Sequence, residues 1–377
     1  MQEFDAIRPY TDDEVPPVVR RLVSNPQLLN GASHLFTPRL ARFAPAAASW
    51  LARQGLLRRT RDLATIADVQ RFLAGYMHRL VEETVVELTV TGFEQIEPGT
   101  AYLFVSNHRD IFMDSGLLNY RLYQSGQQTC RVAVGDNLLA EPYVEDLMRV
   151  NKSFVIERSV TGKRAIYAAL SRSSNFIRHS LEQGHSVWIA QREGRAKDGF
   201  DRTEPAVLKM LALAYRGEQE AFGDFLGRVQ LVPVSVTYEL DPCDEMKAHE
   251  LAVIEREGKY EKAPGEDLRS IVAGMTGFKG RVQLHLSAPL AGDFEDADDC
   301  ARALDKAIVG GLKVFPTHAA AAAELGMPPV KRIDEWLPAV RADFTARLAR
   351  VPAEERKQLL AGYANLVRNR REMGFVD

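Results

Sequence analysis

The spacing of hydrophobic and polar residues changes near residue 85. Residues 66–83 carry apolar positions at helical spacing, whereas residues 85–90 (VVELTV) alternate as a half-buried strand does. Short apolar runs bounded by turn-forming residues predict further strands at 101–107, 130–135, 152–157, 186–191, 229–238 and 281–290. Helical patterns lie between several of them, notably at 163–183 and 204–215. Strands that alternate with helices predict an α/β fold with a mixed, largely parallel sheet flanked by helices.

The pattern also predicts where the chain divides. After residue 326 the run MPPVKR interrupts the regular structure, and two charged helices are expected at 333–350 and 353–372. We therefore expect an N-terminal arginine-rich helical region at 1–84, an α/β domain at 85–325 and a C-terminal helical extension at 326–377.

Composition excludes several classes of protein. The chain has 377 residues, of which 46% are hydrophobic, so it can bury a sizeable core. Its formal charge of −3 argues against a generally basic nucleic-acid binder, and no nucleic-acid partner is expected. Three widely separated cysteines favour a reducing compartment. No apolar run is long enough to span a bilayer, and the first residues do not read as a signal peptide, so we expect a cytoplasmic protein.

Charge is unevenly distributed along the chain. Residues 15–61 contain eight arginines and no acidic residue, with leucine, phenylalanine and tryptophan between them. This composition is typical of helices that lie on anionic lipid. It also fits a small helical subdomain whose arginines face water, or one that receives an acidic carrier protein. With the first reading, the protein is peripheral on the inner face of the cytoplasmic membrane.

The first candidate for chemistry is SNHRDIFMD, residues 106–114, directly after the buried run AYLFV. A histidine that leaves a strand end, followed by carboxylates, offers a general base and the acid that orients it. His108 is expected in the loop, Asp110 near a helix N-cap, and Asp114 one turn inside the helix. Asp110 is a rival to Asp114 for the orienting role. The alternative is that Asp110 only caps the helix and His108 is a polar loop residue.

Three further blocks follow in the sequence. NKSFVIER ends in Arg158, which could pair with a phosphate or lie on the surface. WIAQREGRAKDG contains Glu193, Gly194 and Arg195, where glycine allows close approach of a ligand and the cations suit an anionic group. An ordinary charged turn has the same composition. VPVSVTY reads as a buried strand with Pro233 at its start or at a bulge.

In this order, NH…D, F-x-x-x-R, EGR and VPVSVTY, the chain resembles the phospholipid/glycerol acyltransferase family from about residue 90 to 238. The resemblance implies that His108 deprotonates the acceptor hydroxyl, which attacks an acyl thioester, and that Asp114 orients His108. It implies substrate binding by Asn107, Arg158, Glu193, Gly194, Arg195 and Pro233. Five residues separate His108 from Asp114 where the family usually has four, and QREGR replaces the common Phe-Pro before the acidic residue.

The expected reaction moves a fatty acyl chain from acyl-CoA or acyl-ACP to 1-acylglycerol-3-phosphate in phospholipid synthesis. Glycerol-3-phosphate is the alternative acceptor. Because a thioester is already activated, no metal or other cofactor is expected. Two other classes are weighed against this one. One is a metal-dependent phosphoesterase that uses His108, Asp110 and Asp114 as ligands, and the other is a non-enzymatic protein that binds anionic lipid.

Overall fold

The computed structural model describes residues 2–139, 141–216, 222 and 224–375. The chain forms two compact units whose segments interleave in the sequence. The smaller unit comprises Met1–Tyr76 and Arg131–Phe176, and the larger comprises Met77–Cys130 and Ile177–Asp377. Two long helices, α5 (Ile66–Thr84) and α8 (Lys163–Glu182), begin in the smaller unit and end in the larger. α5 ends at Thr84 and β1 begins at Val85, while the boundary between the two units falls earlier, between Tyr76 and Met77.

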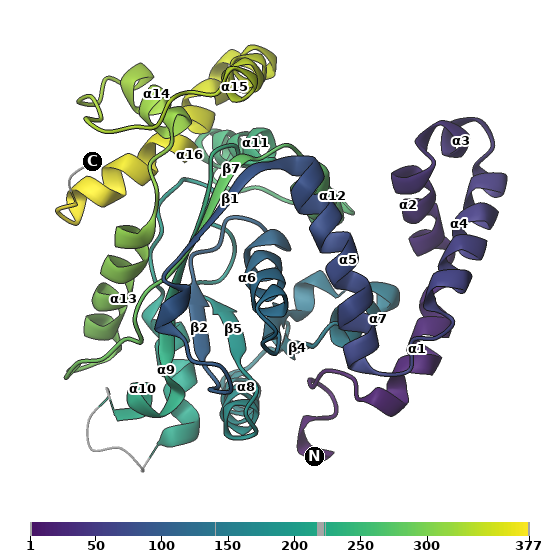
Figure 1. Ribbon diagram of the computed structural model, residues 1–377. Coiled ribbons are helices and arrows are strands. Elements are labelled where there is room, and N and C mark those ends of the chain that lie inside the picture. The colour runs from purple at the N-terminus through teal and green to yellow at the C-terminus, as the bar shows by residue number, and fades with distance from the viewer. Residues whose placement is uncertain (1, 140, 217–221, 223, 376–377) are drawn as a thin grey trace. The chain divides into compact units, whose positions relative to one another are not determined.

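The larger unit is built on five strands: β1 (Val85–Thr91), β2 (Leu103–Ser106), β5 (Val187–Ala190), β6 (Leu231–Tyr238) and β7 (Gly280–Leu286). Their order is β1-β7-β6-β2-β5, and all neighbours are parallel except β6 and β7 (Figure 1). Every residue of β2 and β6 is buried, as expected for central strands of a sheet covered on both faces. The predicted fold class, a mixed and largely parallel sheet flanked by helices, is confirmed.

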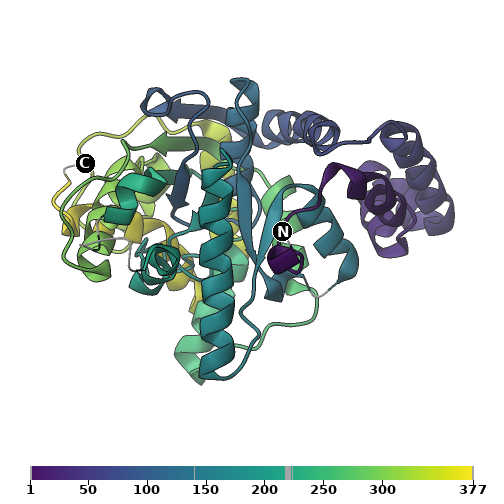
Figure 2. The same ribbon diagram turned by 90° about the horizontal axis from the view of Figure 1, so that it is seen from below.

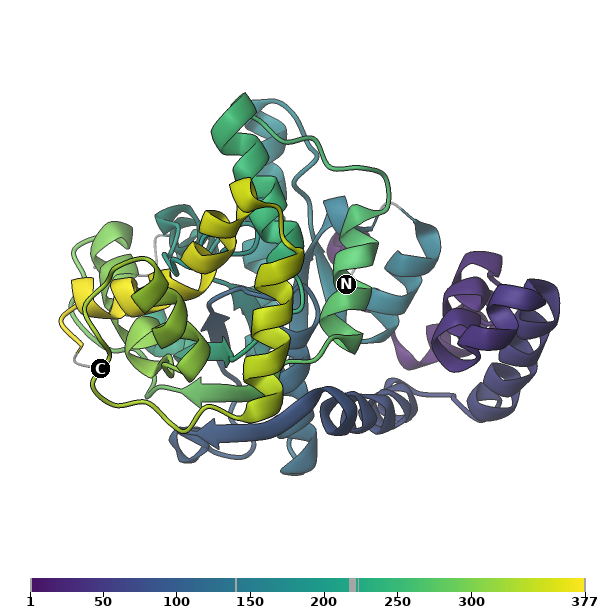
Figure 3. The ribbon, with the colours of Figure 1, turned by 90° about the horizontal axis from the view of Figure 1, so that it is seen from above.

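Helices of the larger unit connect and cover these strands. They are α6 (Met113–Gln124), α9 (Pro205–Ala212), α10 (Asp224–Val229), α11 (Asp244–Glu257), α12 (Glu266–Thr276), α13 (Ala297–Gly311), α14 (Pro316–Glu324), α15 (Pro338–Arg350) and α16 (Ala353–Glu372). α13 packs on β6 and α9, while α16 packs on α11 and α14 (Figure 3). A cluster of buried side chains, with Phe344 and Tyr363 among them, joins the last three helices to the end of β6. The C-terminal helices therefore support the strand that carries VPVSVTY.

Proline determines several boundaries of the smaller unit. Its helices are α1 (Val15–Leu22), α2 (Pro26–Phe36), α3 (Pro38–Phe43), α4 (Pro45–Thr60) and α7 (Pro142–Val150). Four of these five begin at proline, whose fixed φ suits the first helical position. α2, α3 and α4 pack on one another, as the purple helices of Figures 1 and 2 show. A parallel pair, β3 (Arg131–Gly135) and β4 (Ser153–Ile156), completes this unit.

Two predicted elements differ from the observed ones by four or more residues at one end. The C-terminal helix expected from residue 333 begins at Pro338, because the residue before a proline is disfavoured in a helix. The strand expected at 281–290 ends at Leu286, three residues before Pro289, which has no N–H to give to a ladder. Among the described residues, no helix is both long enough and apolar enough to cross a membrane.

Candidate active site

His108 and Asp114 face each other at the carboxyl end of β2. His108 follows the strand by two residues, and Asp114 is the second residue of α6. The chain turns back between them, so that His108 Nδ1 lies 2.9 Å from Asp114 Oδ2. The His108 side chain is 15% exposed and the Asp114 side chain is fully buried. His108 Nε2 has no hydrogen-bond partner within residues 2–139, 141–216, 222 and 224–375, so this nitrogen is open to a substrate.

The carboxylate of Asp114 is held at both oxygens. Oδ2 also accepts hydrogen bonds from the main-chain N–H groups of Arg109 (2.7 Å) and Asp110 (2.9 Å). Oδ1 accepts one from the Tyr238 hydroxyl (2.8 Å). Donors at both oxygens hold the carboxylate against rotation. The spacing of five intervening residues is therefore compatible with a histidine–carboxylate pair.

Asp110 takes a different role from Asp114. Its Oδ1 accepts hydrogen bonds from the N–H groups of Phe112 (2.9 Å) and Met113 (2.8 Å), which caps the start of α6. Burial raises the pKa of Asp110, and the negative charge of Asp114 raises it further. In this arrangement Asp114, and not Asp110, is the carboxylate that holds His108.

Asn107 and Pro233 lie where β2 and β6 run side by side. The Asn107 amide donates to the Val236 carbonyl (3.0 Å) and accepts from the Val236 N–H (2.8 Å), so its side chain ties the two strand ends together. Pro233 is the third residue of β6 and shows no bulge in its pairing with β2. Its carbonyl accepts from the N–H of Ser287, beyond the end of β7. A main-chain N–H at position 233 would point to the same side as this carbonyl, beyond the last residue of β7, so the absence of this N–H in proline removes no hydrogen bond between β6 and β7.

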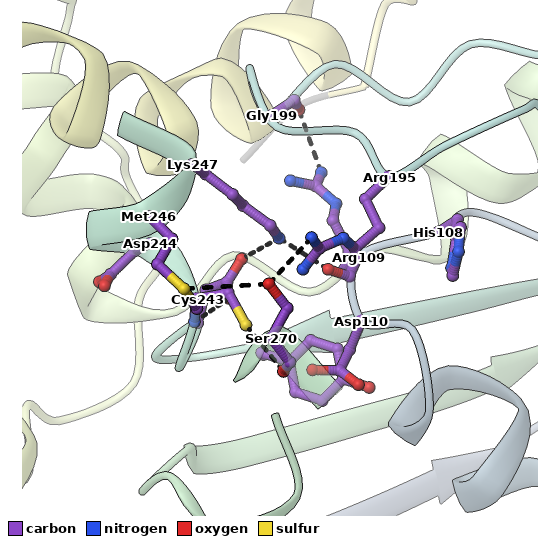
Figure 4. Close-up of polar contacts among 12 residues, drawn as sticks. His108, Arg109, Asp110, Arg195, Gly199, Cys243, Asp244, Met246, Lys247 and Ser270 are labelled. Atoms are coloured by element: carbon purple, nitrogen blue, oxygen red, sulfur yellow. Dashed lines mark hydrogen bonds and ion pairs between the residues drawn. The ribbon is translucent and has the colours of Figure 1, made fainter. Parts of the chain in front are cut away.

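The EGR block forms the loop after β5. Glu193 and Gly194 are exposed, and Gly194 has a φ of +72°, which suits glycine in this turn. Arg195 reaches inward, where Nη2 donates to Ser270 of α12 (3.3 Å) (Figure 4). Its Nη1 is buried and has no hydrogen-bond partner in the part of the chain that the structure describes. The N–H of Ala196 donates to the His108 carbonyl (2.7 Å), so this loop borders the histidine directly.

A buried ionic frame supports the loop that carries His108. Arg109 pairs with Asp201 (2.5 Å) and donates to the Gly199 carbonyl (3.0 Å). Lys247 of α11 donates to the Arg109 carbonyl (2.6 Å) and pairs with Asp241 (Figure 4). The Lys247 charge, opposed by burial, lowers the pKa of Asp241. The frame fixes the main chain on the C-terminal side of His108.

Arg158 belongs to the smaller unit, in the chain that follows β4. Its main-chain N–H donates to the Asp136 carboxylate, and its guanidinium lies against Gly135 at the end of β3. These contacts define its place within that unit alone, and its role toward a phosphate stays a prediction.

The sequence did not single out Tyr238, Trp188 or the ionic frame. Tyr238 is the last residue of the VPVSVTY block, and parity along the strand places it on the side of Val234 and Val236. Trp188 of β5 lies edge to face with His108, with ring centroids 5.9 Å apart. Neither partnership has a local signal, because the residues are distant in sequence.

Among the described residues, no group of three or more His, Cys, Asp or Glu side chains could hold a metal ion. Both oxygens of Asp114 and Oδ1 of Asp110 accept hydrogen bonds from N–H or O–H donors, while Asp110 Oδ2 is buried without a partner in the described part of the chain. These carboxylates therefore act as hydrogen-bond acceptors.

Part of the chain matches a known protein family. The family model described as Acyltransferase matches residues 87–236, the segment that contains His108, Asp114 and the EGR loop. The match covers 150 of the 377 residues and supports the prediction, made from the motifs, that the protein is an O-acyltransferase. Among solved structures it is similar to the 1-acyl-sn-glycerophosphate (LPA) acyltransferase PlsC of Thermotoga maritima. The identity is 16%, the TM-score is 0.40, and the match covers 75% of this chain and 92% of that one. A comparison with curated proteins gives no match.

Proposed function

We propose that the protein transfers a fatty acyl chain from a thioester to the free hydroxyl of 1-acylglycerol-3-phosphate. The donor is acyl-CoA or acyl-ACP, and glycerol-3-phosphate is the alternative acceptor. The observation that supports the chemistry is the His108–Asp114 pair, with Nδ1 held at 2.9 Å and Nε2 open. An imidazole fixed in this way can accept a proton at Nε2 while the carboxylate stabilises the imidazolium.

The reaction follows from this geometry. His108 Nε2 accepts the hydroxyl proton as the acceptor oxygen attacks the thioester carbonyl carbon, and a C–O bond forms. The tetrahedral intermediate then collapses, the C–S bond breaks, and the thiolate takes the proton from the imidazolium. The products are the ester and the free thiol, and no cofactor enters the balance. Asp114 keeps its position throughout because donors hold both of its oxygens.

The phosphate of the acceptor needs a cation near His108. Arg195 suits this role because its Nη1 is buried and unpartnered within the described residues, one residue from the Ala196 contact to His108. A guanidinium can hold a phosphate in bidentate geometry. Exposed Glu193 and Gly194 would shape the mouth of that pocket. The motif resemblance supports Arg158 as a further phosphate contact. It also supports Pro233 as a residue that lines the substrate site.

The arginine-rich helices of the smaller unit would hold the enzyme on an anionic membrane surface. Phe43 is 82% exposed, Trp50 60% and Leu51 46%, and Arg42 lies over the Phe43 ring. Large exposed apolar side chains beside arginines are suited to the boundary between lipid headgroups and acyl chains. We propose a cytoplasmic enzyme that is peripheral on the inner face of the membrane. The same surface could receive acidic acyl carrier protein.

The test is a panel of labelled acyl-CoA and acyl-ACP with each of the two acceptors. His108→Ala should lower the rate about 10²–10⁴-fold. His249→Ala is the matched control, because His249 is half exposed and pairs with Glu355. If wild type acylates neither acceptor, the proposed reaction is wrong. Liposome binding that persists without any acyl transfer would instead favour the lipid-binding class.

A further inference from the structure

Tyr238 contacts the catalytic pair through Asp114. Its hydroxyl donates to Oδ1 at 2.8 Å, while Oδ2 faces His108 at 2.9 Å. The side chain is 5% exposed, so water cannot easily replace it. A carboxylate held at one oxygen could turn about its Cβ–Cγ bond, whereas one held at both oxygens keeps Oδ2 aimed at the imidazole.

The hydroxyl is fixed as a donor. Burial, together with the negative charges of Asp114 and Asp110, raises the pKa of Tyr238 well above its ordinary value. The phenol therefore stays protonated at neutral pH, and its proton points toward Asp114. A hydrogen bond from a neutral donor to a buried carboxylate also withdraws negative charge from the oxygen that faces His108.

The main chain at position 238 is anchored from three sides. Tyr238 pairs with Val282 of β7, and two residues earlier Val236 is clamped by the Asn107 amide. The buried His318 ring bonds to the Tyr238 main chain. These contacts come from three different elements, so the phenol has one well-defined position beneath the catalytic pair.

We infer that Tyr238 is a positioning residue of the acyl transfer, acting through Asp114 to orient His108. This inference rests on the proposed function. Loss of the hydroxyl should leave the carboxylate freer to rotate, which lowers kcat. It should also leave more charge on Asp114, which stabilises the imidazolium and moves the acidic limb of the kcat/KM profile to higher pH.

The test compares Tyr238→Phe with Tyr120→Phe. Tyr120 lies on α6, the helix of Asp114, and its hydroxyl bonds to His78 rather than to the pair. We expect Tyr238→Phe to lower kcat about tenfold with little change in KM, and to move the acidic limb of kcat/KM to higher pH. In an Asp114→Asn background, Tyr238→Phe should lower kcat almost no further, because the carboxylate through which the phenol acts is already absent.

Several results would overturn the inference. One is a Tyr238→Phe profile that matches Tyr120→Phe, and another is a full additional loss in the Asp114→Asn background. If Tyr238→Phe does not fold, 3-fluorotyrosine at position 238 keeps the shape and strengthens the donor. The acidic limb should then move to lower pH, and an unmoved limb overturns the inference. An inactive wild type would instead refute the proposed function.

Discussion

The carboxylate of Asp110 packs directly against Gly274 of α12. A Cβ atom at position 274 would lie 2.0 Å from Asp110 Oδ2, a distance at which one group must move. Because the other oxygen of Asp110 caps α6, any displacement would be transmitted to the first turn of that helix, where Asp114 lies. A residue far from His108 in sequence thus constrains the catalytic loop.

Gly274→Ala should therefore lower both stability and activity. We expect a loss of about 1–3 kcal/mol in the free energy of unfolding, as for other overpacked cores, and a fall in kcat. Gly75→Ala is the matched control, because Gly75 lies in α5 with no atom within 4 Å of an added Cβ. We expect Gly75→Ala to leave the free energy of unfolding unchanged or to raise it by about 0.5–1 kcal/mol. Denaturant unfolding and initial rates check both, and equal behaviour would refute the steric argument.

Asp114→Asn and Asp110→Asn should have different effects. The first can present an N–H to His108 Nδ1 in place of an acceptor, and should lower kcat by on the order of 10⁴-fold. The second keeps an acceptor for the N–H groups of Phe112 and Met113, and asparagine caps as well as aspartate. We expect its free energy of unfolding to change by less than about 1 kcal/mol and most of its activity to remain.

The measurement for this pair is steady-state kinetics beside thermal unfolding of each variant. If Asp110→Asn lost as much kcat as Asp114→Asn while staying folded, Asp110 would have to be assigned to the orienting role.

Local pattern was enough to predict the strand before His108 and the helix after it. Alternation and buried runs located β2, β5 and β6, and because their carboxyl ends meet at one edge, the motifs on them converge. The two carboxylates after His108 could be named, but their roles could not be separated. That choice depends on how tightly the loop turns, and no residue type in SNHRDIFMD determines it.

Sequence patterns carry no signal for partners that are distant in the chain. Tyr238 is 124 residues from Asp114, and Asp201 is 92 residues from Arg109. Each pair forms only when β6, or the loop after β5, is placed beside β2. Sequence patterns indicate the face of the sheet on which a residue lies, but they do not indicate which side chain from a neighbouring element contacts it.

The buried pair of Arg109 and Asp201 should be costly to break on one side. Asp201 is fully buried and Arg109 is 11% exposed, so Asp201→Asn would leave the guanidinium charge without its partner. We expect a loss of about 3–5 kcal/mol in the free energy of unfolding. Asp298→Asn is the control, because its pair with Lys209 is exposed on both sides and should contribute less than about 1 kcal/mol. Urea unfolding compares them, and equal losses would refute the argument.

His318 should make the protein sensitive to acid. Its Nδ1 accepts from the Phe315 N–H at 2.9 Å, and burial, aided by the positive charge of Arg109, lowers its pKa to about 3. The ordinary histidine pKa is about 6.5, so between these values the unfolded chain holds a proton that the folded protein does not. Because the folded pKa is depressed, the free energy of unfolding falls as pH falls through this window, by about 1.4 kcal/mol per pH unit from this group.

His318→Asn tests this dependence, because asparagine can still accept a hydrogen bond but does not titrate. We expect the variant to be less stable than wild type at pH 7, and the difference to narrow steadily from pH 6 to pH 4. His249→Asn is the control, because His249 is half exposed. This variant should show the same dependence of the free energy of unfolding on pH as wild type. Urea unfolding at each pH supplies the data. Parallel curves for wild type and His318→Asn would show that His318 carries no such proton linkage.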